Sequence, residues 1–234
     1  MNQDQKRNAY AVKMRWFLLL APTLIAAGVS GHGMLLDPPQ RSSMWRFGYG
    51  TPKNFNDNEL FCGGFDVQYG KNGGNCGECG DPWQLERPRP NELGGLYGLG
   101  IITANYTAGD TVKLSVQLTT NHWGYFEFRI CPVGPKEMVD QDCLDRYLLP
   151  TIPSDIHGPT VEPPPDGYKW FLPTHDRGTF EIKAILPSGL RCERCVLQWR
   201  YITATRWGHC DDGTTADGCG PQEWFQNCAD VRIS

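Results

Sequence analysis

His32 is the residue of this chain best suited to metal chemistry, because the segment before it is typical of an export signal. That segment has four basic residues within positions 6–15 and an apolar stretch over 16–28 that is too short to span a bilayer. It ends in small residues at 29–31, so residues 1–31 are predicted to be a secretory signal peptide. Cleavage there would leave His32 first, with an α-amine and an imidazole that can chelate one metal ion through two nitrogens.

A second imidazole is available at His122. It lies in the turn 120–124 between two predicted strands, and the rigid end of a sheet can hold a ligand precisely. Nitrogen donors suit Cu(II), so His32 and His122 are the candidate copper ligands. The other three histidines lie in loops and are interpreted as ordinary surface or hydrogen-bonded residues: His157, His175 and His209. The chain contains neither a Gly-x-Ser-x-Gly nor a His-Glu-x-x-His motif, which argues against these two classes of hydrolase.

Length and charge indicate one exported domain. Residues 32–234 number 203, enough for a single catalytic domain with a substantial core. Of the 22 basic and 26 acidic residues in the chain, four and one lie in the predicted signal, which leaves 18 and 25 and a net charge of −7. This balance argues against a nucleic-acid partner, and no polybasic cluster indicates membrane attachment. We expect a soluble, secreted monomer without a membrane anchor.

The exported part contains all ten cysteines, and an even number in an exported chain is typical of a disulfide framework. They are Cys62, Cys76, Cys79, Cys131, Cys143, Cys192, Cys195, Cys210, Cys219 and Cys228. The Cys-x-x-Cys pairs at 76–79 and 192–195 also suggest structural zinc, but more than 110 residues separate them and the oxidising export route favours disulfides. Their pairing stays open. Asn105 begins the only glycosylation sequon.

The elements that must position these residues are strands. From 32 to about 100, the abundance of Gly, Asn and Pro predicts a long disulfide-pinned loop region with short helical turns near 40–45. Beyond it, apolar residues alternate with other residues in five segments, 112–119, 125–130, 180–184, 197–201 and 229–233. A Pro-rich excursion over 132–177 includes a predicted short helix near 137–149. The pattern predicts an all-β fold, an antiparallel immunoglobulin- or fibronectin-III-like β-sandwich.

Four motifs occur in order along the exported part. They are His-Gly-Met at 32–34, Cys-Gly-Glu-Cys-Gly-Asp at 76–81, Asn-His-Trp-Gly-Tyr-Phe at 121–126 and Gln-Glu-Trp-Phe-Gln-Asn-Cys-Ala-Asp-Val at 222–231. Together they resemble the lytic polysaccharide monooxygenases of auxiliary-activity family 15, which are widespread in arthropods. The resemblance covers essentially all of the exported domain.

This resemblance implies a histidine brace. The α-amine and imidazole of His32, with the imidazole of His122, would hold one copper ion in a T-shape. The family places an aromatic residue at the axial position, five residues before the aspartate of the terminal strand, which is Phe225 here; its neighbour Trp224 should point the other way on a strand. The implied reaction is hydroxylation at C1 or C4 of a glycosidic link, with C1 favoured. It uses O₂ or H₂O₂ and an external electron donor, on insoluble chitin first and cellulose second.

Several further residues are expected near this site. Related enzymes often have alanine at the position of Thr120, so its hydroxyl is expected to contact a bound water or oxygen species. Gln198 is predicted to donate a hydrogen bond close to the ligands, although strand alternation alone makes an ordinary outward-facing residue an equal alternative. Tyr49, Trp123 and Trp207 are candidates for stacking on sugar rings.

Two other functions remain open at this point. A non-catalytic chitin-binding module would use the same fold and the same aromatic residues. An extracellular copper-binding protein would use the same histidine brace without binding polysaccharide.

Overall fold

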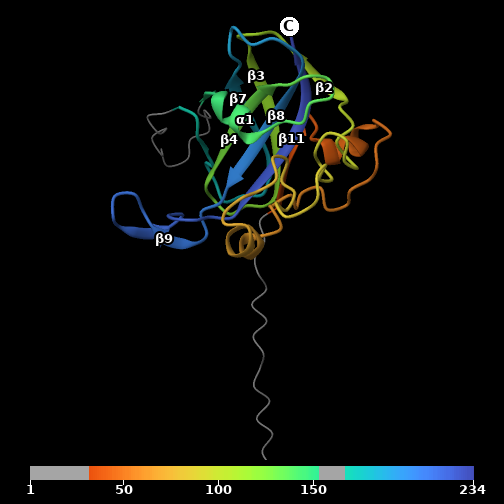
Figure 1. The fold of residues 1–234 in the computed structure, drawn as a ribbon. Coiled ribbons are helices and arrows are strands. Elements are labelled where there is room, and N and C mark those ends of the chain that lie inside the picture. The colour runs from red at the N-terminus through yellow and green to blue at the C-terminus, as the bar shows by residue number, and fades with distance from the viewer. Residues whose placement is uncertain (1–31, 153–166) are drawn as a thin grey trace, which may run out of the picture.

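The computed structural model describes residues 32–152 and 167–234, so the predicted signal peptide and His157 lie outside the described residues. Two β-sheets pack against each other (Figure 1). The first has the order β1 (His32–Asp37), β3 (Thr111–Thr120), β7 (Gly178–Ile185), β5 (Thr151–Ile152). The second has the order β2 (Ile102–Tyr106), β11 (Trp224–Ile233), β8 (Cys192–Ile202), β4 (Tyr125–Pro132), β6 (Trp170–Phe171).

The five alternating segments form β3, β4, β7, β8 and β11, and the predicted all-β sandwich is confirmed. Their apolar residues face one another between the sheets and form the main core, in which Leu118, Phe126, Trp199 and Phe225 are at most 1% exposed. Neighbouring strands in both sheets are antiparallel with one exception, because β2 runs parallel to β11.

The prediction that the chain is loop from residue 32 to about 100 is wrong at its start. Strand β1 pairs with β3, and Met34 and Leu35 are both buried, so the segment does not alternate. Gly33 explains how closely β1 approaches the core. A Cβ there would lie 2.6 Å from Leu118 and 2.9 Å from Trp199, so no larger residue fits without displacing them. β2 is a further strand that the sequence did not predict, a five-residue segment paired with β11.

A third layer covers the outer face of the second sheet. It consists of the long loop region, with the 3₁₀ helix η1 (Arg41–Phe47) and the π-helix η2 (Asp66–Lys71), and of the helix α1 (Gln141–Arg146), which packs on β4. Both short helices predicted near 40–45 and 137–149 are therefore present. Within the described residues, no helix is long and apolar enough to cross a membrane.

All ten cysteines form disulfides, as predicted, and both Cys-x-x-Cys segments are accounted for without zinc. The pairs are Cys62–Cys76, Cys79–Cys228, Cys131–Cys143, Cys192–Cys195 and Cys210–Cys219. The Cys79–Cys228 bridge links the long loop region to β11 across 149 positions. It therefore fixes the third layer on the sheet.

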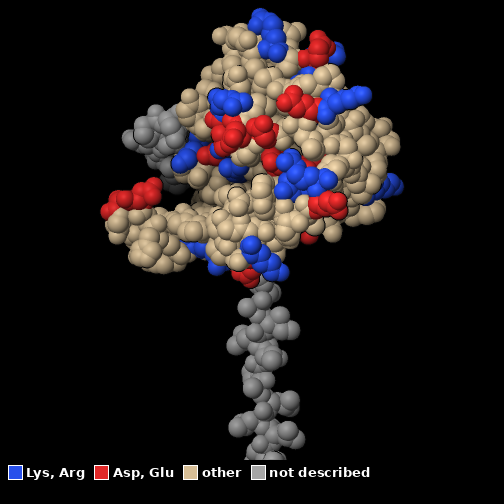
Figure 2. All heavy atoms as spheres, viewed as in Figure 1, with Lys and Arg blue, Asp and Glu red and all other residues tan. Residues whose placement is uncertain are grey.

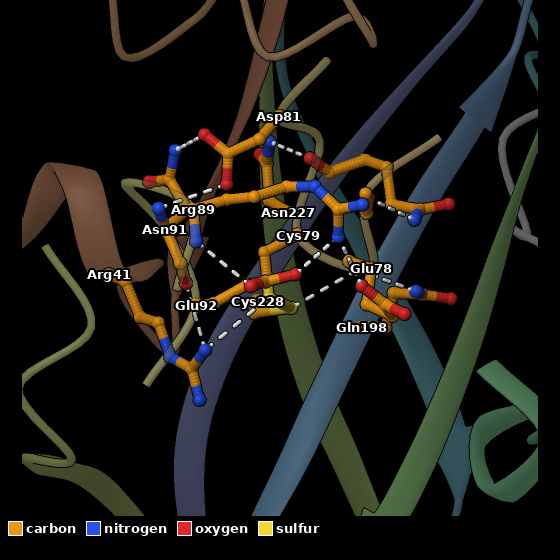
Figure 3. The surroundings of a disulfide bond; sticks show 12 residues. Arg41, Glu78, Cys79, Asp81, Arg89, Asn91, Glu92, Gln198, Asn227 and Cys228 are labelled. Atoms are coloured by element: carbon orange, nitrogen blue, oxygen red, sulfur yellow. Dashed lines mark hydrogen bonds and ion pairs between the residues drawn. A yellow bond between two sulfur atoms is a disulfide. The ribbon is translucent and has the colours of Figure 1, made fainter. Parts of the chain in front are cut away.

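A buried network of charged side chains surrounds the Cys79–Cys228 bridge (Figure 3). Asp230 on β11 accepts two hydrogen bonds of 2.7 Å from Arg41 and one of 3.1 Å from Arg194. Deeper in the loop region, Arg89 forms ion pairs with Glu78 and Glu92. Because these groups are almost completely buried, each charge needs the partners that the network supplies.

A two-stranded arm projects from the body (Figure 1). It consists of β9 (Trp207–His209) and β10 (Thr215–Asp217), and the Cys210–Cys219 bridge ties the segment beyond β9 to the end of β10. Figure 2 shows acidic side chains at its tip, where the turn contains Asp211 and Asp212. The arm connects Ile202 at the end of β8 to Trp224 at the start of β11. It therefore leaves the sheet at the end where β4 begins, just after His122.

Candidate metal centre

His32 is the first residue of β1 and is placed by strand pairing. It lies opposite Thr120, the last residue of β3, and the register shifts between His32 and Gly33. The Thr119 hydroxyl donates to the His32 carbonyl across the same pair of strands, at 3.4 Å. His122 follows Thr120 by two residues. The β1–β3 register therefore brings the two predicted ligands to one end of the sandwich.

The turn that contains His122 is held by its backbone. The His122 N–H donates to the Tyr201 hydroxyl at 2.7 Å, and the His122 carbonyl accepts from the Ala204 N–H at 2.9 Å. Gly124 adopts φ 89°, and a Cβ there would lie 1.9 Å from the Ile202 carbonyl oxygen, so only glycine fits. Burial raises the pKa of the Tyr201 hydroxyl above its usual range, which keeps the group protonated. These contacts fix the position from which the 7%-exposed His122 side chain extends.

Asn121 holds the same turn against the strand-free segment 173–177. Its side-chain oxygen accepts from the Trp123 N–H at 2.9 Å, and its amide donates to the carbonyls of Thr174 and Asp176, both at 2.9 Å. Trp123 itself has a positive φ of 53°, which is rare for a bulky residue and requires this local support. Two separate segments therefore hold the backbone on either side of His122.

Phe225 lies in the core next to Tyr201, the residue that supports this turn. It pairs with Tyr201 in the β8–β11 register, stacks on the Tyr201 ring at 5.9 Å and on the Phe61 ring at 5.8 Å, and is fully buried. Since the Tyr201 hydroxyl binds the His122 N–H, Phe225 is one ring away from the predicted ligand. Trp224 contacts Tyr69 and Arg200 instead, so the two neighbours point to opposite faces, as predicted.

The His32 imidazole has one nitrogen engaged. Its Nε2 lies 2.8 Å from a carboxylate oxygen of Glu59. In a neutral imidazole one ring nitrogen is a donor and the other an acceptor, so a ring that donates from Nε2 to this carboxylate has its lone pair on Nδ1. A chelate with the α-amine of the same histidine must use Nδ1, because Nε2 lies on the far side of the ring. The donor set that the structure leaves at His32 therefore fits copper.

The described residues include no group of three or more His, Cys, Asp or Glu side chains arranged to hold a metal. Two imidazoles alone leave a copper site short of donors, and the α-amine created by cleavage before His32 would supply the third. The chemistry of these ligands thus depends on the predicted processing.

Gln198 does not lie with these residues. It is on β8, three residues from Tyr201, and alternation directs it to the opposite face of the sheet. Its amide donates to the Glu78 carbonyl at 2.8 Å and to the Gln141 side chain at 3.0 Å, close to the Cys79–Cys228 bridge (Figure 3). Gln198 therefore joins the third layer to the sheet, and the structure does not bring it to the two histidines.

The aromatic candidates are spread over the surface. Trp207 on the arm is 67% exposed and Tyr49, just after η1, is 38% exposed. Trp123 is partly buried and its ring contacts that of His175. His209 is exposed on the arm. Asn105 lies on β2 and is exposed, so a glycan would be sterically possible there.

Two residues at this site were not identified from the sequence. The alternation over 197–201 predicts a strand, and Tyr201 is buried in its core face, but the pattern gives no sign that the Tyr201 hydroxyl supports His122. Glu59 lies 27 positions from His32 in a segment without periodicity, so no spacing rule could have joined them.

The comparisons with known proteins agree with this geometry. A family model described as lytic polysaccharide mono-oxygenase, cellulose-degrading, matches residues 32–231. The chain is 47% identical to a solved lytic polysaccharide monooxygenase of family AA15 from Thermobia domestica in the Cu(I) state. That match has a TM-score of 0.78 and covers 86% of this chain and 98% of the other. A chitin-binding domain from Burkholderia pseudomallei matches at 13% identity and a TM-score of 0.46, covering 87% and 100%. No curated protein matches.

Proposed function

The chain belongs to the lytic polysaccharide monooxygenases, within family AA15, and we propose on this basis that it cleaves crystalline chitin by oxidation at C1, with cellulose as a second substrate. Enzymes of this family depend on copper. The proposed preference for chitin rests on the resemblance to arthropod enzymes, whereas the description of the matching family model names cellulose degradation. A comparison of the products released from chitin and from cellulose decides between the two substrates.

We propose that residues 1–31 are removed during secretion and that the exported protein acts outside the cell as a monomer. The α-amine and Nδ1 of His32, with the imidazole of His122, then hold one copper ion. The observation that carries this proposal is the β1–β3 pairing of His32 with Thr120, two residues before His122. The family match also begins at residue 32, which supports the proposed cleavage position.

Phe225 and Thr120 complete the proposed site. Phe225 has no donor atom, so it excludes water from its side of the ligands and contributes no bond to the metal. Thr120 lies at the end of β3 opposite His32, where its hydroxyl can hold a water molecule or a reduced oxygen species by a hydrogen bond. Bound copper supplies a one-electron redox centre at which O₂ or H₂O₂ is reduced.

The net reaction balances in either form. With O₂, one oxygen atom enters the C1–H bond as hydroxyl and the other leaves as water, with two electrons and two protons supplied by an external reductant. With H₂O₂, the same hydroxylation releases one water and consumes no further electrons after the metal has been reduced. The hydroxylated C1 then expels the neighbouring sugar as an alcohol, which breaks the chain and leaves a lactone.

We propose that Trp207, Tyr49 and Trp123 contact the polysaccharide. Trp207 has the most exposed ring of the three and lies on the arm, which leaves the sheet at the same end as His122. Stacking of such rings on sugar faces would hold the enzyme on an insoluble surface.

The test uses the protein that starts at His32, loaded with copper and incubated with a reductant and with chitin or cellulose. We expect mass spectrometry to find C1-oxidised oligosaccharides, more from chitin than from cellulose. A matched protein that retains Gly31 keeps both imidazoles but has no free amine on His32, and should be inactive. Absence of oxidised products on both substrates would overturn the proposed activity, and equal activity of the Gly31 form would overturn the proposed ligand set.

A further inference from the structure

We infer that Glu59 is a positioning residue for the metal centre, which selects the tautomer and the orientation of the His32 imidazole needed for copper binding. This inference rests on the proposed function, because it concerns the same site. Glu59 is not a metal ligand in this arrangement, since its carboxylate binds the ring nitrogen that faces away from the α-amine.

The backbone around Glu59 is attached to both sheets. The Asn58 carbonyl accepts from the Gly33 N–H of β1 at 2.9 Å, and the Leu60 carbonyl accepts from the Gln226 N–H of β11 at 2.9 Å. Glu59 thus lies between two residues that are each bonded to a different sheet. Its carboxylate is therefore placed by the same strands that place His32 and Phe225.

Asn58 adds a further contact to this attachment. Its side-chain amide donates to the Thr119 hydroxyl at 3.0 Å, and that hydroxyl in turn donates to the His32 carbonyl. The loop that carries Glu59 is consequently bound to β3 next to Thr120, on the side where His32 pairs. A carboxylate on an unattached loop would be positioned poorly, because the loop would lose backbone and side-chain entropy each time the carboxylate bound the imidazole.

The contact itself has the features of a ligand-orienting hydrogen bond. Metal-binding histidines commonly donate their second ring N–H to a carboxylate, which fixes the ring and strengthens the donor nitrogen. Here the distance is 2.8 Å, with His32 24% and Glu59 40% exposed. A partly exposed pair has little value for folding stability, so its main effect falls on the ring orientation.

The experiment compares Glu59→Ala and Glu59→Gln with the protein that starts at His32. Glu86→Gln serves as the control, because Glu86 is an exposed carboxylate elsewhere in the loop region. In the metal-free proteins, nitrogen NMR of His32 should show the Nε2–H tautomer, with a mixture in Glu59→Ala. Cu(II) affinity should fall by about 10- to 100-fold in Glu59→Ala and by less in Glu59→Gln, whose amide oxygen still accepts.

A second readout concerns charge. Loss of the carboxylate should raise the copper reduction potential in both variants and change the electron paramagnetic resonance spectrum, whereas Glu86→Gln should match the unchanged protein. If the unchanged protein binds copper tightly and both Glu59 variants share its tautomer, affinity and spectrum, the role of Glu59 is wrong and the proposed function stands. Failure of the unchanged protein to bind copper would overturn both. If Glu59→Ala does not fold, the copper reduction potential and the electron paramagnetic resonance spectrum of Glu59→Gln still test the proposal.

Discussion

The surroundings of the two ends of strand β11 are held together by different interactions. Near its start, Phe225 pairs with Tyr201, whose hydroxyl accepts from the backbone N–H of His122, so the turn that contains His122 is held largely by hydrogen bonds to its backbone. Near its end, Asp230 is buried and forms ion pairs with Arg41 and Arg194. The first region fixes the backbone that carries two imidazoles, and the second uses buried ion pairs to hold a layer of loops on the sheet. Substitutions of the two histidine side chains in the first region should therefore change function with little effect on folding, and substitutions of the buried charges in the second should do the reverse.

The largest expected effect is on copper binding in His122→Ala. Loss of one of three donors should weaken Cu(II) affinity by more than the roughly 100-fold upper limit for an orienting residue, and should abolish oxidised products. The turn should survive, because the backbone of His122 makes its contacts to Tyr201 and Ala204. Calorimetric titration with copper and thermal unfolding check both expectations. His209→Ala on the arm is the control, and a folded His122→Ala protein with undiminished affinity would contradict the assignment.

Asp230→Ala tests the other region. It leaves Arg41 and Arg194 buried without their shared carboxylate, which should lower the free energy of unfolding by about 3–5 kcal/mol and the Tm by roughly 10 °C. The copper spectrum of the protein that remains folded should not change. In contrast, Glu193→Ala breaks an exposed ion pair with Arg232 and should lower stability by less than about 1 kcal/mol. Similar Tm values for both variants would contradict the importance of the buried network.

The buried network should also respond to pH through Asp81. Burial raises the pKa of Asp81 to about 6, above its usual value near 4, despite two hydrogen bonds from Asn91. The folded state therefore binds a proton more tightly than the unfolded state, so this group's contribution to stability is full at low pH and decreases as pH rises from about 4 to 6.

Asp81→Asn removes this titration. Relative to that variant, the unchanged protein should lose up to about 2–3 kcal/mol of unfolding free energy between pH 4 and pH 7. Denaturant unfolding at both pH values measures this difference, and a difference that stays constant with pH would show that Asp81 does not titrate there.

The smallest expected effect is that of Trp207→Ala, which lies outside both regions. The ring is mostly exposed, so stability should change by less than about 0.5 kcal/mol. Binding to chitin should weaken by about five-fold, equivalent to about 1 kcal/mol for one lost stacking contact. A depletion assay on insoluble chitin measures the binding, with His209→Ala as the matched change on the same arm. Equal depletion by both variants would remove Trp207 from the proposed substrate surface.

How far the sequence was informative also differs between regions. Alternation identified β3, β4, β7, β8 and β11, because each buries one face in a common core. It missed β1, since the loop layer and the core bury neighbouring residues of that strand alike. The same layer misled the assignment of Gln198. Alternation correctly places the Gln198 side chain on the face of β8 opposite the core. On that face it donates a hydrogen bond to the Glu78 carbonyl of the loop layer, and it does not reach the two histidines.

The candidate site was only partly predictable for a similar reason. His32 and His122 are recognisable from the sequence because a copper site needs nitrogen donors, and because the strand pattern places His122 at a turn. Glu59 depends on contacts between segments far apart in sequence, through Gly33 and Gln226, which no local pattern encodes.

The direction of β11 has a practical consequence for handling the protein. Its ten residues, Trp224–Ile233, run from the end of the sandwich where the arm leaves the sheet toward Ser234, a distance of roughly 30 Å at the usual rise of a strand. The C-terminus lies at the other end of the body from the arm (Figure 1). An affinity tag or a surface tether attached after Ser234 would leave the arm and the histidines facing the medium, whereas any tag retained ahead of His32 would occupy the amine itself.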